Sequence, residues 1–360
     1  MMIPYVEIIR ETADGSLKVF SFIEPSECWF ELKYHGFGEF ELYCPATKKN
    51  LTALKKGYYV KIPNRRFGWF ITSVQYEFKA ESGVRMVSAK GYELKWLLKK
   101  RIIQKPIQLS TNLFQAVHGL VNANIGEGAS EARKLPFFKS VQNSETIIIP
   151  DTQATRGNLG EYVDTLLTAH SCGSTAVFVG EGTNTLGIAF EAYKGQEKAK
   201  SVRFSQSFDN LLSSTYYSSD ENVGSYALVV STIDDVDYTR EVDKRAVGSR
   251  RSEILVESNI STKYEDANGV ERETTPTSTL YQGWQEEEGK NKLAERITIE
   301  DVSGEIDLQN SLYKFDEDFF LGDVVRVQDE YFDFFLDTRI AKVTIKQDSS
   351  GYGEEVEYNK

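Results

Sequence analysis

Short runs of alternating apolar and polar side chains follow one another through the first third of this chain. Val6–Arg10 and Leu17–Ile23 flank Asp14-Gly15, a dipeptide whose residues can both take the positive φ of a tight hairpin turn. Cys28–Tyr34 and Glu39–Cys44 alternate in the same way. A period of two residues predicts strands with one buried face. The sequence therefore predicts a series of antiparallel hairpins here, and not a bundle of long helices.

The pattern continues to about residue 110. Further strand-like runs occur at Tyr58–Ile62, Trp69–Tyr76 and Val84–Ala89. They lead into Tyr92–Arg101, whose leucines have helical spacing. On such a helix the lysines face solvent, namely Lys95, Lys99 and Lys100. Strands closed by one short helix predict a small β-barrel over residues 1–110.

The rest of the chain divides into a mixed region and a second β-rich region. Residues 111–205 contain two amphipathic helical patterns, Asn112–Asn122 and Gly157–His170, followed by a hairpin pattern, which together predict an α+β domain. Strand patterns return in 206–245 and 297–360, which predict a second β-rich unit, and 246–296 is predicted to be a smaller inserted loop and helix subdomain. The expected fold is therefore α+β and β-rich, with one barrel, a second β-rich unit and two insertions.

Composition limits the partners and the compartment. The chain has 42 Lys and Arg against 54 Asp and Glu, a net charge of -12, which argues against wrapping nucleic acid or binding an anionic membrane surface. No run of about 20 apolar residues and no secretory signal is present, so we expect synthesis in a cytoplasm and no membrane insertion. The three cysteines, Cys28, Cys44 and Cys172, form no CxxC pair, and we interpret them as buried apolar residues.

Catalytic patterns are sparse. His170-Ser171-Cys172 contains a Cys and a His, but neighbours at a helix end rarely point together, and a solvated helix end is the simpler interpretation. No metal or cofactor motif occurs, and we expect no cofactor and no metal. Two alternatives stay open. One is a cell-wall glycan hydrolase that uses the acidic residues Asp316, Glu317, Asp318, Asp333 and Asp337, and the other is a carbohydrate-binding tail protein that uses Trp69 or Trp284.

Four segments, in order, carry a resemblance to a known family. Ser88–Ile103 resembles the Gly-x-x-Leu-x-x-Leu-Leu-x-x-Arg-Ile-Ile stretch of siphophage tail-tip hub proteins, also called tail-associated proteins. Thr155–Tyr162 resembles the start of their middle-domain helix, and Phe208–Val230 resembles the return into their second barrel. Leu321–Ile345 resembles their closing Leu-Gly-Asp-x-Val-x-Val and Arg-Ile hairpin. These proteins are similar to the baseplate hub of contractile-tailed phages.

The resemblance implies a structural role and no enzymatic activity. It implies two tail-tube-like β-barrels per chain and a homotrimer whose ring continues the tail tube. The ring would attach to the distal tail protein, with the tape-measure protein and a tail fibre or receptor-binding protein as further partners, and would open for DNA ejection. Phage DNA would pass through without specific binding. Because the sequence ends soon after the closing hairpin, at Lys360, we expect no added cell-wall hydrolase module.

The ends of the chain carry opposite charge. Residues 1–110 have a net charge of +7 and residues 301–360 a net charge of -9, which suggests that barrel one of each chain contacts barrel two of the next. The expected interface residues are Lys95, Lys99, Lys100, Arg101, Asp323, Asp329 and Glu330. The polar segment Lys263–Thr279 is a candidate docking loop, with Glu265, Asn268, Glu271 and Arg272 as its contact residues. Ordinary solvated faces and an ordinary hairpin tip remain the alternatives for these two surfaces.

Overall fold

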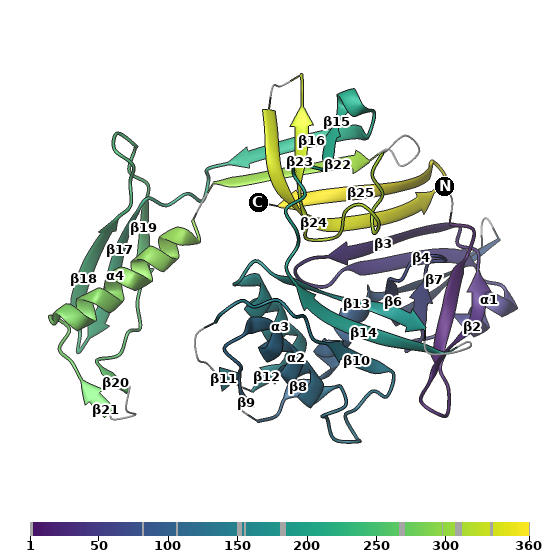
Figure 1. The fold of residues 1–360 in the computed structure, drawn as a ribbon, viewed down its shortest axis with the longest axis horizontal. Coiled ribbons are helices and arrows are strands. Elements are labelled where there is room, and N and C mark those ends of the chain that lie inside the picture. The colour runs from purple at the N-terminus through teal and green to yellow at the C-terminus, as the bar shows by residue number, and fades with distance from the viewer. Residues whose placement is uncertain are drawn as a thin grey trace. The chain divides into compact units, whose positions relative to one another are not determined.

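The computed structural model describes residues 3–80, 83–105, 107–149, 153–154, 156–180, 185–265, 271–296, 298–306, 312–331 and 334–359. The chain forms two compact units (Figure 1). The main unit comprises Met1–Thr215 and Val302–Lys360, and the insertion unit comprises Tyr216–Asp301. As the sequence predicts, the protein is rich in β-strands and has few helices.

The first third of the main unit is a set of antiparallel strands, as expected. Its elements are β1 (Val6–Glu11), β2 (Leu17–Ile23), β3 (Glu27–Lys33), β4 (Glu39–Pro45), the short helix α1 (Lys48–Ala53), β5 (Tyr59–Lys61), β6 (Gly68–Lys79) and β7 (Val84–Glu93). The strands lie in the order β2-β1-β5-β6-β7-β4-β3. Gly15 has a φ of 76°, so the turn between β1 and β2 uses the positive φ that the Asp-Gly pair predicts.

The last part of the chain adds strands to the same sheet. These strands are β15 (Arg203–Ser205), β16 (Leu211–Ser219), β22 (Ile299–Ile306), β23 (Val324–Asp329), β24 (Phe334–Asp348) and β25 (Gly351–Asn359). The long strand β24 pairs antiparallel with β3 on one side and with β25 on the other. The sheet of the first third therefore continues, without a break in pairing, into the C-terminal strands.

The middle of the chain packs two helices beside this sheet. A short 3₁₀ helix, η1 (Leu94–Lys100), leads into β8 (Ile102–Ile103), β9 (Ile107–Gln108), α2 (Leu113–Asn124), β10 (Phe138–Val141), β11 (Gln153–Ala154), β12 (Gly157–Asn158), α3 (Leu159–Thr168), β13 (Gly173–Gly180) and β14 (Leu186–Tyr193). Asn112 and Asn158 cap α2 and α3 by accepting backbone N–H hydrogen bonds. Both helices lie where the sequence predicts them.

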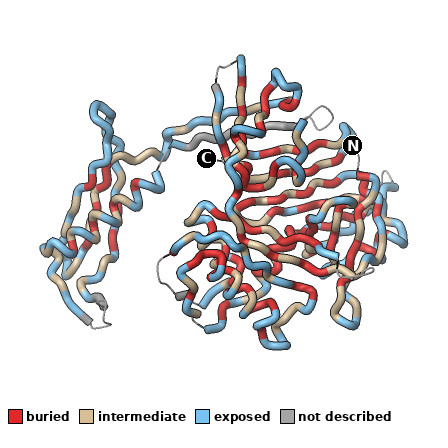
Figure 2. The backbone as a smooth tube through the Cα atoms, viewed as in Figure 1, coloured by how far each residue is buried: buried red, intermediate tan, exposed pale blue. Residues whose placement is uncertain are grey.

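Two apolar cores support the main unit (Figure 2). The first joins residues that are far apart in sequence, for example Phe30 and Trp69 with Val343 and Tyr358. The second fills the space around α2, α3 and β14. Because the first core includes side chains from both ends of the chain, neither end can bury its apolar face alone.

The insertion unit is a small sheet covered by one helix. It contains β17 (Tyr226–Ile233), β18 (Val236–Asp243), β19 (Glu253–Glu257), the two-stranded hairpin β20 (Lys263–Glu265) and β21 (Glu271–Glu273), and α4 (Thr279–Ala294). The three larger strands lie in the order β18-β17-β19, with β17 and β19 parallel.

The structure draws the boundary of this insertion differently from the sequence analysis. The predicted insertion is 246–296, whereas the compact unit starts at Tyr216 and ends at Asp301. The reason is the pairing of β17 with β18 and β19, which places residues 226–243 in the insertion. In the sequence these two strands look like any other β-hairpin, and nothing in their pattern shows which sheet they join.

Candidate functional site

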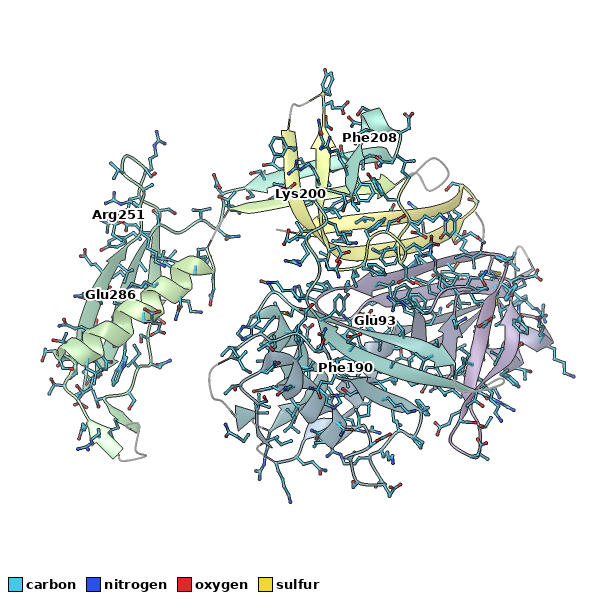
Figure 3. All side chains as sticks on the ribbon, viewed as in Figure 1. Glu93, Phe190, Lys200, Phe208, Arg251 and Glu286 are labelled. Atoms are coloured by element: carbon cyan, nitrogen blue, oxygen red, sulfur yellow. The ribbon has the colours of Figure 1, made fainter. Side chains whose placement is uncertain are left out.

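The basic residues expected at a subunit interface lie on and just after η1. Lys95 was predicted to face solvent, but it is buried. Its side chain is 2% exposed, with Nζ 3.3 Å from Oε1 of Glu93. Nζ also donates to the carbonyl oxygens of Lys33 and Ser174. The error comes from the helix type: with three residues per turn, Lys95 lies above the buried Leu98. Burial raises the pKa of Glu93, which is labelled in Figure 3, while Lys95 opposes that rise.

The other three basic residues have more accessible side chains. Lys99 Nζ lies 3.1 Å from Oε1 of Glu161 on α3, and the exposed Lys100 places its Nζ 4.7 Å from the ring centre of Trp96. Arg101 is half-buried and donates from Nε to the carbonyl of Arg133. These side chains thus tie η1 to the middle domain, and Lys100 is the one most open to another molecule.

Of the acidic interface residues, Asp323 and Asp329 are buried inside the main unit. Asp323 Oδ1 accepts from the backbone N–H of Gln196 at 2.7 Å, and Oδ2 accepts from that of Phe320 at 2.9 Å. Asp329 accepts from Gln206 and from the hydroxyl of Ser214. Carboxylates that are buried and held by internal donors offer little to a neighbouring subunit, so the burial of these two residues in the single chain speaks against their predicted interface role. Glu330 is exposed, although its Oε1 accepts from Ser205 at 3.3 Å.

The candidate docking loop is a hairpin. Glu265 ends β20 and Glu271 begins β21, and Arg272 pairs with Tyr264 across the two strands with its side chain exposed. Asn268 lies outside the described residues. A docking role for this hairpin stays a prediction.

The oppositely charged ends of the chain meet within one molecule, along the seam between β3 and β24. Lys342 on β24 lies opposite Lys33 on β3 in the strand register, and the Nζ atom of Lys342 lies 3.3 Å from Oε1 of Glu31 on β3. The same ammonium group also pairs with Glu357 on β25. One lysine of the acidic C-terminal end therefore bridges carboxylates from both ends of the chain, which ties the seam together but leaves the opposite net charges of the two ends in place.

Two consecutive arginines strengthen the same junction. Arg65 Nη2 lies 2.5 Å from Oε1 of Glu354, whose side chain is 1% exposed, and Arg65 Nη1 donates to the carbonyl of Phe315. Arg66 pairs with Asp316 at 2.8 Å. Charged hydrogen bonds to a desolvated carboxylate are the stronger kind. These pairs fix the loop after β5 to the C-terminal segment.

Sequence reasoning missed the centre of the junction, which is Tyr34. Its hydroxyl accepts the backbone N–H of Gly195 at 3.0 Å and lies 3.2 Å from the carbonyl oxygen of Tyr193. Gly322, with a φ of 90°, leaves room for the ring, because a Cβ there would collide with it. Gly322 and Asp323 belong to the Leu-Gly-Asp motif, so that motif has a physical cause here: the glycine admits Tyr34 and the aspartate caps two backbone N–H groups.

A pocket of about 220 Å³ opens beside Tyr193 at the same junction. Its lining mixes charges, with Arg66 and Lys194 against Glu145 and Glu191. Burial raises the pKa of Glu191, and the nearby Arg66 opposes that rise. The residues come from all three parts of the main unit, so the pocket belongs to the packing of the junction.

The carboxylates of the hydrolase alternative are engaged in local contacts. Asp337 binds Arg326 through two hydrogen bonds, which lower its pKa. Asp316 pairs with Arg66, and Asp318 accepts the backbone N–H of Lys314. Asp333 lies outside the described residues. A general acid needs a raised pKa, so the lowered pKa of Asp337 does not suit that role.

The other candidate chemistry is not assembled either. All three cysteines are buried as predicted, and burial raises the pKa of Cys28 to about 12 and of Cys172 to about 11. Cys172 Sγ lies 3.4 Å from the carbonyl oxygen of His170 and does not contact its ring. Within the described ranges, no three His, Cys, Asp or Glu side chains gather where they could hold a metal ion. In the same part of the chain, no helix has the length and apolarity to cross a membrane.

The two tryptophans of the sugar-binding alternative differ in position. Trp69 is completely buried, and its Nε1 donates to the carbonyl of Glu31, so it offers no face to a sugar. Trp284 on α4 lines an open groove of the insertion unit together with Lys263, Glu288 and Asn291. Of these two side chains, Trp284 is therefore the one that lines an open surface.

Comparison with known proteins gives a consistent result. Residues 24–357 match the family described as Siphovirus ReqiPepy6 Gp37-like protein. No curated protein matches the sequence. Among solved structures, the chain is similar to the tail protein from Neisseria meningitidis MC58, with a TM-score of 0.56, 11% identity, and coverage of 99% of this chain and 96% of that one. It is also similar to the 43 kDa tail protein of prophage MuSo2 from Shewanella oneidensis, with a TM-score of 0.54, 12% identity, and coverage of 99% and 98%.

Proposed function

This chain belongs to the family of Siphovirus ReqiPepy6 Gp37-like proteins, a phage tail protein family, and from that membership we propose that it is the tail-tip, or baseplate, hub of a siphophage or prophage tail. In this proposal three copies form a ring that continues and closes the tail tube. The ring attaches to the distal tail protein and opens when DNA is ejected. The protein acts by assembly and gating and has no catalytic role.

The observation that carries the proposal is that the likeness extends over the whole architecture. The family match covers residues 24–357, and the two tail proteins share the fold over nearly their full lengths. A likeness confined to one sheet would be compatible with many functions, because a fold alone does not determine function. Here the strands, the middle helices and the insertion all take part.

The seam between β3 and β24 supports a body with two tube-like barrels. We propose that residues 1–110 form the first barrel and that the C-terminal strands with β16 form the second. Residues 111–205 form the middle domain between them. Three chains then supply six barrels to a ring with pseudo-six-fold symmetry. Pairing of β3 with β24 holds the two barrels of one chain at a fixed register, which a tube wall requires.

The proposed partners follow from this position at the virion tail tip. The distal tail protein would lie on one face of the ring, the tape-measure protein would end in its lumen, and a tail fibre or receptor-binding protein would attach below. Phage DNA would pass without specific binding, because a net charge of -12 repels phosphate. Synthesis would take place in the cytoplasm of the bacterial host.

Two measurements test the proposal. Antibodies against the chain are expected to label the tip of intact tails in electron microscopy. The purified chain is expected to give a native mass near three times 40.8 kDa by light scattering. Labelling along the tail shaft or at the capsid would overturn the assignment to the tip, and release of sugar fragments from purified cell walls would overturn the non-catalytic part.

A further inference from the structure

The insertion unit has a sheet face that α4 does not cover. Side chains alternate along β17, so Ala227, Val229 and Ser231 face α4, where Gln285 donates to the hydroxyl of Ser231. The opposite face carries Leu228 and Val230 on β17. Leu255 lies directly beside Leu228 in the register of β17 and β19, and it is 63% exposed.

Carboxylates surround these apolar side chains. In register, Glu241 lies beside Leu228, and Glu257 lies beside Val230. Further exposed carboxylates on the same face are Asp237, Asp243 and Glu253. We call this surface, with Leu228, Val230 and Leu255 at its centre, the acidic sheet face.

Only part of this charge is neutralised locally. Asp243 lies 2.7 Å from Arg245, and Glu253 lies 2.6 Å from Arg251, which is labelled in Figure 3. Within the described part of the chain, Asp237, Glu241 and Glu257 make no ion pair. The whole unit, residues 216–301, has 19 Asp and Glu against 10 Lys and Arg. An exposed apolar centre with an acidic rim is the composition of a docking surface for a basic partner.

The main unit carries a surface of opposite charge. Lys48, Lys49, Lys55 and Lys56 lie on and just after α1, and all four are exposed. None of them makes an ion pair with a described residue. The exposed Leu51 lies between them in the sequence, so this surface also combines charge with an apolar side chain. We call it the lysine patch. Its four lysines are among the cations that give residues 1–110 their net charge of +7.

We propose that the acidic sheet face of one copy docks on the lysine patch of a second copy. Two carboxylates of the C-terminal segment, Glu354 and Asp316, are already engaged by Arg65 and Arg66. The free positive charge at α1 therefore lacks an acidic partner there, and the acidic sheet face provides one. Because the two surfaces differ, the contact is heterologous and joins copies head to tail.

The contact would be weak in isolation and strong in a closed ring. Exposed charge pairs contribute about 0.2–1 kcal/mol each and are screened by salt. Burial of Leu255 adds an apolar anchor at the centre. Closure makes the last contact intramolecular, so the ring holds more tightly than any one contact. The inference concerns this pair of surfaces and does not require the tail-tip assignment.

The test reverses the charges on each surface of the full chain. Lys55→Glu with Lys56→Glu, and separately Glu241→Lys with Glu257→Lys, are each expected to weaken self-association about tenfold, since like charges then meet. Light scattering across a concentration series at low and high salt measures the effect. The matched control, Lys105→Glu with Lys200→Glu, changes exposed lysines outside the patch by the same total charge and is expected to leave association unchanged.

Mixing distinguishes a contact between copies from one within a chain. A protein with Lys55→Glu and Lys56→Glu and a protein with Glu241→Lys and Glu257→Lys are expected to associate with each other more tightly than either does with itself, because the exchanged glutamates and lysines then face one another. Leu255→Asp is expected to weaken association without lowering the melting temperature. The proposal fails if the unaltered chain stays monomeric at every concentration and salt, or if neither reversal weakens association more than the control does. An oligomer whose association is unchanged by these charge substitutions would overturn this contact without affecting the tail-tip assignment.

Discussion

The two units of this protein organise their cores and charges in opposite ways. The main unit has two apolar cores, one of which is shared by both ends of the chain, and it joins these ends by ion pairs between distant residues, such as Arg65 with Glu354. Among its described residues, the insertion unit has an apolar core of five buried side chains, and helix α4 pairs charges one turn apart, such as Glu286 with Lys290. The main unit should therefore unfold as one cooperative body, and the insertion unit should open by itself at a lower free energy.

The largest effect is expected from Trp69→Ala in the main unit. Trp69 is fully buried in the core that both ends of the chain share, and its loss removes a large apolar side chain and the hydrogen bond to Glu31. We expect a loss of about 4 kcal/mol in the free energy of unfolding. Thermal unfolding measured by calorimetry should show the transition of the main unit at a lower temperature and the transition of the insertion unit unchanged.

Tyr76→Ala is the matched control, because Tyr76 lies on the same strand and is mostly exposed. It should change the stability by less than about 0.5 kcal/mol. If Trp69→Ala moved both transitions together, the two units would not be independent, and the contrast drawn above would not hold.

Leu293→Ala is expected to act only on the insertion unit. Leu293 is the residue of α4 in the five-residue core, and its truncation should cost about 3 kcal/mol. Amide hydrogen exchange should then lose protection in β17, β18 and α4, while β3 and β24 stay protected. Leu280→Ala, an exposed position on the same helix, provides the comparison and should leave exchange unaltered. Loss of protection in β24 would contradict the prediction.

The sequence predicts local structure well and the arrangement of the units poorly. The alternating patterns locate β1 to β7, and the helical patterns locate α2 and α3, because these signals depend on neighbours in the chain. Lys95 was misplaced because the three leucines and three lysines of Leu94–Lys100 fit an α-helix and a 3₁₀ helix equally well, and the two helices bury different faces.

The candidate site shows the same limit. Nothing near Tyr34 in the sequence indicates that Gly173, Gly195 and Gly322 will close around it, since these residues lie more than a hundred positions away. The charge difference between the ends was visible in the sequence, but its partial neutralisation by the pairs of Arg65 with Glu354 and Arg66 with Asp316 was not. Strand pairing between distant segments decides both, and a single sequence carries no local signal for it.

Glu354→Gln is expected to have an intermediate effect on the seam. The carboxylate of Glu354 is almost fully buried, and its replacement leaves the guanidinium of Arg65 without its charged partner. Removing one member of such a pair is costly, and we expect about 2 kcal/mol because Arg65 keeps some access to water and its bond to Phe315. Chemical denaturation measures this change in the main unit.

Glu317→Gln is the control for the seam. Glu317 pairs with Lys314, and both side chains are about two thirds exposed, so this change should be close to neutral. Equal effects of Glu354→Gln and Glu317→Gln would mean that the long-range pair contributes no more than a local surface pair.

The smallest effect concerns acid pH, and it compares one ion pair from each unit. Arg326 lowers the pKa of Asp337 in the main unit, and Arg245 lowers that of Asp243 in the insertion unit to about 2. A lowered folded-state pKa contributes stability above the ordinary aspartate value of about 3.9, and this contribution is lost as the pH falls through the lowered value. Both pairs are partly or fully exposed, so the effect is small.

Asp337→Asn should therefore flatten the acid dependence of the melting temperature of the main unit alone. Asp243→Asn should flatten the acid dependence of the melting temperature of the insertion unit alone. Melting curves from pH 6 to pH 3 measure both effects. If either variant changed the acid dependence of the other unit's transition, the units would be coupled through their charges, and the separation inferred from their cores would be incomplete.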